Sequence, residues 1–307
     1  MMGSMILKTV CALMCVGALW MSTGAALADS IIAPGAKLEK VADGYDFTEG
    51  ASCDAQGNAY FTDQPNNKLL KYGIDGKISV VMEPAGRSNG TCFDNKGHIW
   101  TCADEKNELW CIDLHGKEMK VVRVIKGYNG KLLNGPNDVW LRPDGGLYVT
   151  DPYYKRPYWN RGPMEQDCQA VYYLAPNHNE FVRVVGDLKQ PNGIVGTPDG
   201  KTLYISDIGD NKTYVYKVNP DGKLTDKKLF CSLGSDGMTM DNEGNVYLTG
   251  KGVTVFDKHG KQIEHVPVPE DWTGNICFTG VDRHTLFITA SKGVYTLKMR
   301  VKGVGSQ

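Results

Sequence analysis

A short phrase that recurs six times limits the folds open to this chain. It begins with an acidic or amide residue that Gly usually follows, continues through an apolar stretch and a turn containing Gly, and ends in an aromatic-rich segment. In five copies the first residue and the turn glycine are eight positions apart, and the sixth copy is degenerate. The first residues of the copies, named the lead residues, are 39 to 55 positions apart: Glu49, Asn89, Asn137, Asn192, Asp236 and Asn275.

Each copy contains three or four short alternating segments joined by turns such as Asp54-Ala55-Gln56-Gly57. Alternation of apolar and polar residues is typical of β-strands, and glycine suits hairpin turns because it tolerates φ > 0. Residues 29–307 carry no sustained 3.6-residue apolar period, so long helices are not expected. Repeats of about 40 residues with four strands each are typical of propeller blades. The sequence therefore predicts an all-β, six-bladed β-propeller.

The last repeat predicts how the ring closes. After Asn275 the chain has room for only three strands, at residues 275–278, 285–290 and 293–299. A blade needs four strands, and an unpaired edge invites aggregation. We therefore expect the segment Lys37–Val41, which precedes the first repeat, to pair with Val294–Met299 and complete the sixth blade.

The first 28 residues have the pattern of an export signal. Lys8 is their only charged side chain, an apolar run follows at residues 10–20, and Ala26-Leu27-Ala28 fits a cleavage site. The run is shorter than the ~20 residues that span a bilayer, and an uncleaved membrane anchor is the less favoured alternative. We expect residues 1–28 to be removed, residues 29–307 to form a single domain, and the mature protein to be periplasmic or secreted without a membrane attachment.

Charge and cysteine content exclude several classes of partner and cofactor. The chain has 34 basic and 35 acidic residues and no basic run, so nucleic acid and anionic membranes are not expected as partners. Seven cysteines follow residue 28 with no CxxC or other metal-ligand spacing, which argues against zinc. We expect free thiols that pack as small apolar groups, with a Cys102–Cys111 disulfide across one hairpin as the alternative. The histidines fall in or beside expected turns, and no Ser/His/Asp set is visible.

The lead residues predict a metal site. In a propeller the first strand of each blade lines the central channel, so equivalent positions converge on one mouth of that channel. All six lead side chains offer an oxygen and none is His or Cys, and such hard donors select calcium over zinc or copper. The two carboxylates would balance the charge of the ion. The alternative is that Asn-Gly and Asp-Gly pairs only form turns where strands begin.

An insertion in the third repeat is expected to cover the same mouth. Between its second and third strands the chain runs from Asp151 to Ala170, where the first repeat uses only a short link. The insertion contains several Tyr and Trp residues together with Arg156 and Arg161, which suit a polar, ring-shaped ligand, and long ordered loops often have a function. Both arginines are predicted to bind substrate. A solvated packing loop is the alternative.

At these residues the chain resembles the gluconolactonase family, which also contains regucalcin (senescence marker protein) and the drug-responsive lactonases. The resemblance extends over essentially the whole of residues 29–307. The matching phrases are Phe47-Thr48-Glu49-Gly50, Pro136-Asn137-Asp138-Val139, Gln190-Pro191-Asn192-Gly193 and Ser235-Asp236-Gly237-Met238.

The resemblance implies one catalytic divalent ion, usually calcium, with other divalent cations as alternatives. It implies metal ligation by Glu49, Asn137, Asn192 and Asp236, and contact of Asn89 and Asp138 with the substrate or its water. Departures from the family pattern leave the particular lactone open: Ala51 replaces a usual proline, Gly135 replaces an arginine found in regucalcin-like members, and Thr101-Cys102-Ala103-Asp104 replaces a Cys-Glu-His-like turn.

The predicted reaction is hydrolysis of a sugar lactone, such as D-glucono-1,5-lactone, to its aldonate. The ion would polarise the carbonyl, and a carboxylate would take the proton from an attacking water. Asp138 and Asp236 are both candidates for this base, and Asp138 is slightly favoured because direct ligation lowers the pKa of Asp236. Two other functions remain open: phosphotriester hydrolysis at the same site, and a non-catalytic propeller with a structural calcium that binds glycans or protein. The sequence does not predict an oligomeric state.

Overall fold

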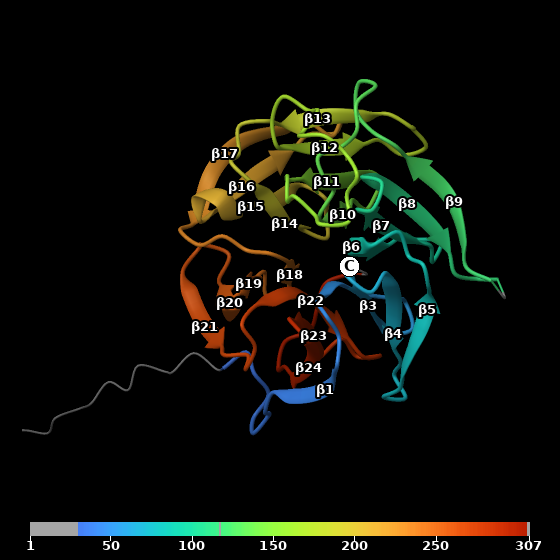
Figure 1. The fold of residues 1–307 in the computed structure, drawn as a ribbon. Coiled ribbons are helices and arrows are strands. Elements are labelled where there is room, and N and C mark those ends of the chain that lie inside the picture. Colours follow the sequence, from blue (N-terminus) through green and yellow to red (C-terminus); the bar gives the residue numbers. More distant parts are fainter. Residues whose placement is uncertain (1–29, 117, 306–307) are drawn as a thin grey trace, which may run out of the picture.

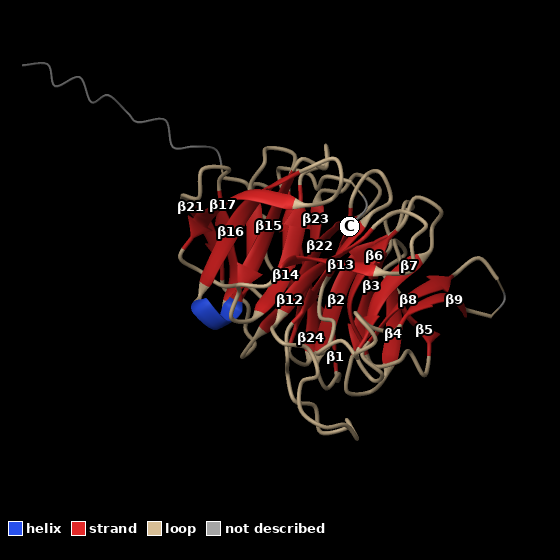
Figure 2. Ribbon diagram, turned by 90° about the horizontal axis from the view of Figure 1, so that it is seen from above, coloured by secondary structure: helices blue, strands red, loops and turns tan. Residues whose placement is uncertain are grey.

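Six four-stranded antiparallel sheets surround a central axis in the computed structural model, which describes residues 30–116 and 118–305 (Figure 1). This arrangement confirms the predicted six-bladed β-propeller. The strands cross the thickness of the ring and the loops that connect them lie on its two faces (Figure 2). The predicted signal peptide at residues 1–28 lies outside the described residues. No helix in the described part of the chain is long and apolar enough to cross a membrane.

The blades follow the sequence repeats in order. Blade one comprises β2 (Thr48–Cys53), β3 (Ala59–Asp63), β4 (Lys68–Tyr72) and β5 (Ile78–Met82). Blade two comprises β6 (Ser88–Phe93), β7 (Ile99–Ala103), β8 (Glu108–Asp113) and β9 (Lys120–Ile125). Blade three comprises β10 (Val139–Leu141), β11 (Leu147–Asp151), β12 (Ala170–Leu174) and β13 (Phe181–Val185). Blade four comprises β14 (Pro191–Gly196), β15 (Thr202–Asp207), β16 (Lys212–Val218) and β17 (Leu224–Cys231), with the short 3₁₀ helix η1 (Ile208–Asp210) after β15. Blade five comprises β18 (Met238–Met240), β19 (Val246–Gly250), β20 (Gly252–Phe256) and β21 (Gln262–Val266). Blade six comprises β22 (Thr273–Thr279), β23 (Thr285–Ala290), β24 (Gly293–Lys298) and β1 (Glu39–Asp43).

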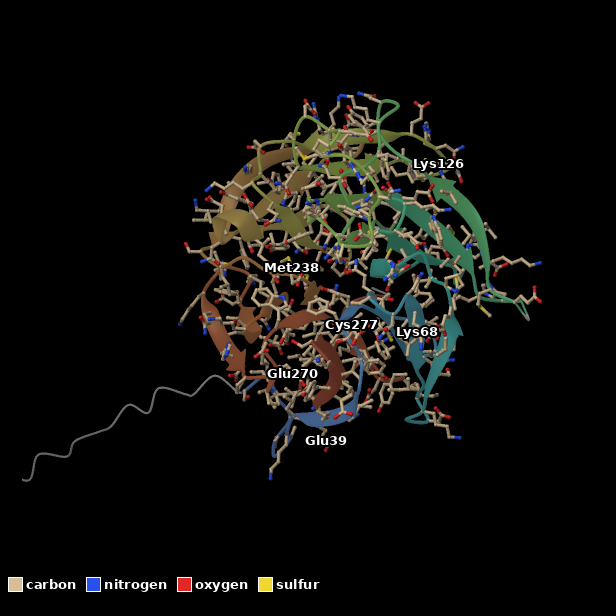
Figure 3. All side chains as sticks on the ribbon, in the orientation of Figure 1. Glu39, Lys68, Lys126, Met238, Glu270 and Cys277 are labelled. Atoms are coloured by element: carbon tan, nitrogen blue, oxygen red, sulfur yellow. The ribbon has the colours of Figure 1, made fainter. Side chains whose placement is uncertain are left out.

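Burial along a blade explains its sequence pattern. The inner strands β2 and β6 are buried at every position, whereas the outer strand β9 alternates between exposed and partly or fully buried residues. The apolar core lies between adjacent blades, as in the edge-to-face contact of Tyr247 in blade five with Phe278 in blade six, whose ring centroids are 5.4 Å apart. Met238 and Cys277, on the first strands of blades five and six, lie close to the centre of the ring, and Glu39 lies at its rim (Figure 3).

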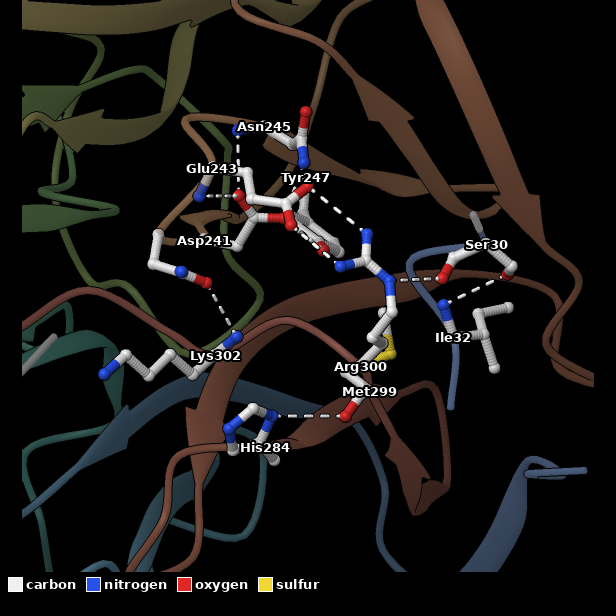
Figure 4. Close-up of polar contacts among 11 residues, drawn as sticks. Ser30, Ile32, Asp241, Glu243, Asn245, Tyr247, His284, Met299, Arg300 and Lys302 are labelled. Carbon is white, nitrogen blue, oxygen red and sulfur yellow. Dashed lines mark hydrogen bonds and ion pairs between the residues drawn. The ribbon is translucent and has the colours of Figure 1, made fainter. Parts of the chain in front are cut away.

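The ring closes as the repeat count predicts. Strand β1 pairs with β24 in antiparallel register, from Glu39 opposite Thr296 to Asp43 opposite Gly293. The strand begins two residues later than expected. The chain end beyond β24 reinforces the closure, because the Arg300 guanidinium donates to the Ser30 carbonyl oxygen at 2.8 Å and to the Glu243 carboxylate at 2.9 Å (Figure 4).

Loss of β1 should destabilise the whole ring. Truncating the chain before Gly44 removes the outer strand of blade six and the buried Ile31, and leaves β24 as an unpaired edge. We expect a loss of about 3 kcal/mol or more in the free energy of unfolding, seen as a fall of roughly 10 °C in Tm by differential scanning calorimetry. Glu39→Ala, which trims one exposed side chain within β1, is the control and should leave Tm almost unchanged. A truncated chain with the Tm of the intact protein would show that β1 contributes nothing to closure.

The cysteines behave as small apolar residues. All seven that lie in the described chain are free thiols, and six of them are buried. The β7–β8 register places Cys102 opposite Leu109 and Cys111 opposite Trp100. The alternative of a Cys102–Cys111 disulfide is therefore wrong, because the two residues share a face of the sheet but are offset by two pairs, and such diagonal neighbours are ~7–8 Å apart, beyond the usual reach of a disulfide.

Candidate active site

Five of the six lead residues line one pocket at the mouth of the central channel. The pocket has a volume of about 310 Å³, and its walls include Glu49, Asn89, Asn137, Asn192 and Asp236. Each of these side chains stands at or just before the start of the first strand of its blade, so the ring symmetry of the repeat brings them together. Four of them are at most 5% exposed. The predicted convergence of these five residues on one mouth is present in the structure.

The glycine after a lead residue allows the first strands to approach the axis. A Cβ on Gly50 would lie 2.1 Å from the carbonyl oxygen of Asn89, and a Cβ on Gly193 would lie 2.5 Å from that of Asp236. No side chain fits at such distances, so glycine is required by packing between neighbouring blades. The Asn-Gly and Asp-Gly pairs are therefore more than turn formers.

Three aspartates hold the segments that lead into the pocket. The second strands of blades one, three and four end at Asp63, Asp151 and Asp207. Each carboxylate accepts hydrogen bonds from two backbone amides, which lie three and two positions before the lead residue of the same blade. The accepted amides are Asp46 and Phe47 at 3.3 Å each, Asn134 and Gly135 at 2.9 Å each, and Lys189 and Gln190 at 3.0 and 2.9 Å. Burial raises the pKa of Asp151 to about 7 although both amide bonds favour its charged form. The sequence analysis missed this role, and the signal for it was an aspartate at the end of a second strand.

The donor set of the pocket fits a hard divalent cation. Asn192 donates from Nδ2 to the Tyr154 hydroxyl at 3.0 Å, and its Oδ1 is buried without any hydrogen-bond partner. A buried acceptor without a partner is costly, so this oxygen is suited to a ligand. Burial and the charge of Asp236 raise the pKa of Glu49, and burial raises the pKa of Asp236. A bound cation would stabilise the charged form of both carboxylates.

Two predicted residues lie below this pocket. Asp138 and Asn275 line a separate, narrow cavity of about 20 Å³. The other residues of its walls lie one to three positions after the lead residue of their blades, so this cavity lies deeper in the channel than the pocket. It has room for about one water molecule. The convergence expected for the sixth lead residue is therefore wrong, since Asn275 does not line the pocket and its Oδ1 accepts the amide of Ile276 at 2.8 Å.

The Asp138 carboxylate is engaged with the backbone. It accepts the amides of Val139 at 3.0 Å and Ile194 at 3.4 Å, and the Asn275 side chain also bonds to it. Burial raises its pKa to about 7. Because Asp138 is absent from the pocket walls, its position argues against the predicted contact with the substrate or its water.

The inserted segment of blade three separates its two arginines. Arg156 lines the pocket, where its Nε donates to the buried Asp104 carboxylate at 2.9 Å. Arg161 does not line the pocket, and its Nη1 donates to the Leu133 carbonyl oxygen at 2.8 Å. The insertion therefore reaches the mouth with Tyr154 and Arg156, while Arg161 fastens it to the segment before blade three.

Asp104 and Trp272 are further residues that the sequence analysis did not assign to the site. Asp104 accepts bonds from Arg156, from the Tyr158 hydroxyl at 2.8 Å and from Gln64 at 3.1 Å, so it fixes the insertion over the mouth. Trp272 lines the pocket and its indole Nε1 donates to Asp236 Oδ2 at 2.6 Å, which orients that carboxylate. No repeat of the sequence marks either residue, because each belongs to a loop outside the recurring phrase.

Residues 125–292, more than half of the chain, match the SMP-30/Gluconolactonase/LRE-like region. The chain belongs to this family. One curated relative is a gluconolactonase from Zymomonas mobilis. It is 26% identical to this chain over 305 residues, which cover 90% of this chain and 85% of the relative.

Solved structures share the fold. A gluconolactonase from Xanthomonas campestris superposes with a TM-score of 0.79 at 28% sequence identity, covering 88% of this chain and 91% of that one. A regucalcin from Agrobacterium tumefaciens, described as a calcium-binding protein, superposes with a TM-score of 0.73 at 21% identity, covering 87% and 95% of the two chains. At that identity the second likeness supports the fold alone.

Proposed function

We propose that this family member is an exported, calcium-dependent lactonase that opens sugar lactones such as D-glucono-1,5-lactone. One observation supports this most: Glu49, Asp236 and the unpartnered Oδ1 of Asn192 meet in one pocket that also contains polar groups suited to a sugar ring. The gluconolactonase and lactonase names of its relatives agree with this reaction class. Oxygen-only donors favour calcium among the divalent ions.

Glu49, Asn192 and Asp236 would hold the ion, with Asn137 as a fourth protein ligand. A bound divalent ion supplies Lewis-acid polarisation of the lactone carbonyl and stabilises the negative charge that develops on its oxygen. The protein prepares this site by keeping Glu49, Asn137 and Asn192 buried and by fixing the Asn192 amide through Tyr154.

We assign the general base to Asp236 in place of Asp138. Asp236 faces the pocket, where Trp272 orients its carboxylate by donating to Oδ2, so this carboxylate would lie beside the ion and its attacking water. Asp138 lies in the deeper cavity with its carboxylate bonded to two backbone amides. Ligation lowers the pKa of Asp236 and weakens it as a base, but geometry is the stricter requirement for proton transfer.

Asn89, Asn137 and Arg156 would orient the hydroxyl groups of the substrate. Asn89 and Asn137 present amide groups at the pocket wall, and the Arg156 guanidinium is held by Asp104, so its remaining N–H groups are available at the mouth. A planar guanidinium suits pairs of hydroxyl oxygens on a sugar ring.

Hydrolysis of D-glucono-1,5-lactone with and without a chelator tests the proposal. We expect metal-dependent acid release, followed in a weakly buffered solution with a pH indicator. A phosphotriester run in parallel distinguishes the phosphotriesterase alternative. A protein that binds calcium and hydrolyses neither compound would be the non-catalytic propeller.

Arg156 and Arg161 should respond differently to substitution. Arg156→Lys keeps the positive charge but loses the planar fork, and we expect KM for sugar lactones to rise roughly tenfold, about 1.4 kcal/mol, with Tm little changed. Arg161→Lys breaks the bond to the Leu133 carbonyl oxygen outside the pocket, so it should lower Tm and leave KM unchanged. Steady-state kinetics and calorimetry on both variants make the comparison. Equal KM values in the two variants would remove Arg156 from the substrate site.

A further inference from the structure

Blade two has a cluster of metal-ligand side chains at the end away from the pocket. Asn89 stands at the pocket end of β6, so the β6–β7 turn at residues 94–98 and the β8–β9 turn after Asp113 lie at the opposite end of the blade. These turns bring His98, Asp113 and His115 together, with one donor atom of each within 4.8 Å of the others. The sequence analysis placed both histidines in turns and gave them no role.

The repeat itself assigns the protonated nitrogen of His98. In blades one and five the turn that matches Asp94–His98 ends in Asn, and Asn58 and Asn245 donate from Nδ2 to the first aspartate of their turn at 2.7 and 2.8 Å. In blade two His98 Nδ1 takes the same place against Asp94 Oδ2 at 3.1 Å. An ionised carboxylate only accepts hydrogen bonds, so Nδ1 of His98 bears the proton and the lone pair is on Nε2.

His115 is oriented in the same way. Its Nδ1 lies 2.9 Å from Asp113 Oδ1, which also assigns the proton to Nδ1. Its Nε2 points over the β6–β7 turn, since a Cβ on Gly97 would lie 3.0 Å from that atom. The two imidazole rings meet edge to face with centroids 5.9 Å apart. A histidine whose Nδ1–H is bound to a carboxylate and whose Nε2 is free has the arrangement common to metal-ligating histidines.

We propose that His98 and His115 form a second metal site, which binds a borderline divalent ion of the zinc class through their Nε2 atoms while Asp94 and Asp113 hold the two rings. Imidazole nitrogens are typical zinc ligands, whereas the all-oxygen pocket suits a harder ion. Zinc ligands at ~2.0 Å in tetrahedral geometry are roughly 3.3 Å apart, so the two rings must turn toward each other. The His115 side chain is 61% exposed and has room to do so. Solvent would complete the coordination.

Cys111 is not needed as a ligand. It lies near Asp94 and His98, but it is buried, and burial raises its pKa to about 12, which keeps it as a thiol. The site therefore belongs to the exposed side of the cluster.

Zinc titration of the intact protein in saturating calcium tests the proposal. Calcium fills the pocket, and isothermal calorimetry should then detect one further zinc ion per chain. His98→Asn installs the residue that blades one and five already use, so the fold is retained, and we expect zinc affinity to fall at least about tenfold. His115→Ala should have the same effect. Lactone hydrolysis, which depends on the other face, should be unchanged in both variants.

His259 provides the matched control. It occupies the same turn position in blade five, where its amide donates to Asp257 Oδ1 at 2.9 Å as that of His115 does to Asp113, but the residue facing it in the repeat is Asn245. His259→Ala should leave zinc binding intact. The proposal is overturned if no zinc binds in saturating calcium, if His98→Asn binds zinc as tightly as the unaltered protein, or if His259→Ala weakens binding equally.

Discussion

Removal of divalent ions with a chelator should abolish lactone hydrolysis, and Glu49→Gln should weaken metal binding by at least about a hundredfold. The substitution keeps the size of a side chain that is 3% exposed but removes one of the two charges that balance the ion. Loss of a hydrogen-bond partner of a metal ligand weakens metal affinity about 10- to 100-fold. Loss of an anionic ligand itself, from a buried site, should weaken metal affinity by more. Calcium titration by calorimetry, with hydrolysis rates at each calcium concentration, measures both effects.

Asn275→Ala is the control for this experiment. It alters a lead residue of the same repeat that lies outside the pocket, so calcium affinity should stay within about threefold of the unaltered protein. Full activity in metal-free protein would disprove the metal-dependent mechanism. A loss of calcium affinity in Asn275→Ala as large as in Glu49→Gln would contradict the placement of the ion at the pocket.

Asp236→Asn should lower kcat by ~10²–10⁴-fold at saturating calcium, which is the usual contribution of a general base. It should also weaken calcium binding, because the same carboxylate is a proposed ligand. Asp138→Asn should keep kcat within about tenfold, since its carboxylate lies in the deeper cavity. It should instead lower the free energy of unfolding by about 1–3 kcal/mol. The backbone N–H groups of Val139 and Ile194 donate to the two oxygens of Asp138, and in the variant one of them would face an amide nitrogen, which cannot accept a hydrogen bond.

Kinetics at saturating calcium and urea unfolding of both variants make the comparison. The opposite result, with a large loss of kcat and normal stability in Asp138→Asn, would return the base assignment to Asp138. Equal small losses in the two variants would mean that neither carboxylate is the base.

The number of blades and the closure of the ring could be predicted from the sequence because each depends on local regularities. Strand alternation and hairpin turns act over a few residues, and the recurring phrase repeats them six times. The last repeat has room for only three strands, and one further strand precedes the first repeat. These two facts together predicted that β1 would pair with β24. The convergence of Glu49 with Asn192 and Asp236 also followed, since equivalent positions in a ring face the same axis.

The direction of individual side chains was decided by the tertiary structure. Asn137 faces the pocket whereas its neighbour Asp138 and the lead residue Asn275 face the deeper cavity, because an offset of one position reverses the direction of a strand side chain and irregular strand starts make that offset unpredictable. Arg156 and Arg161 lie in the same insertion, but only contacts with separate segments placed one at the mouth and the other away from it.

The sequence by itself determined the periodic part of this protein: six blades, their order, their closure and an oxygen-lined mouth, because these features need only residue type and spacing. Tertiary structure alone decided which turns and loops contact one another. Trp272 reaches Asp236, and His98 meets His115, through contacts between turns and loops whose separation in the chain has no period. Such contacts depend on how far each loop reaches in space, and that distance is fixed only when the blades have packed.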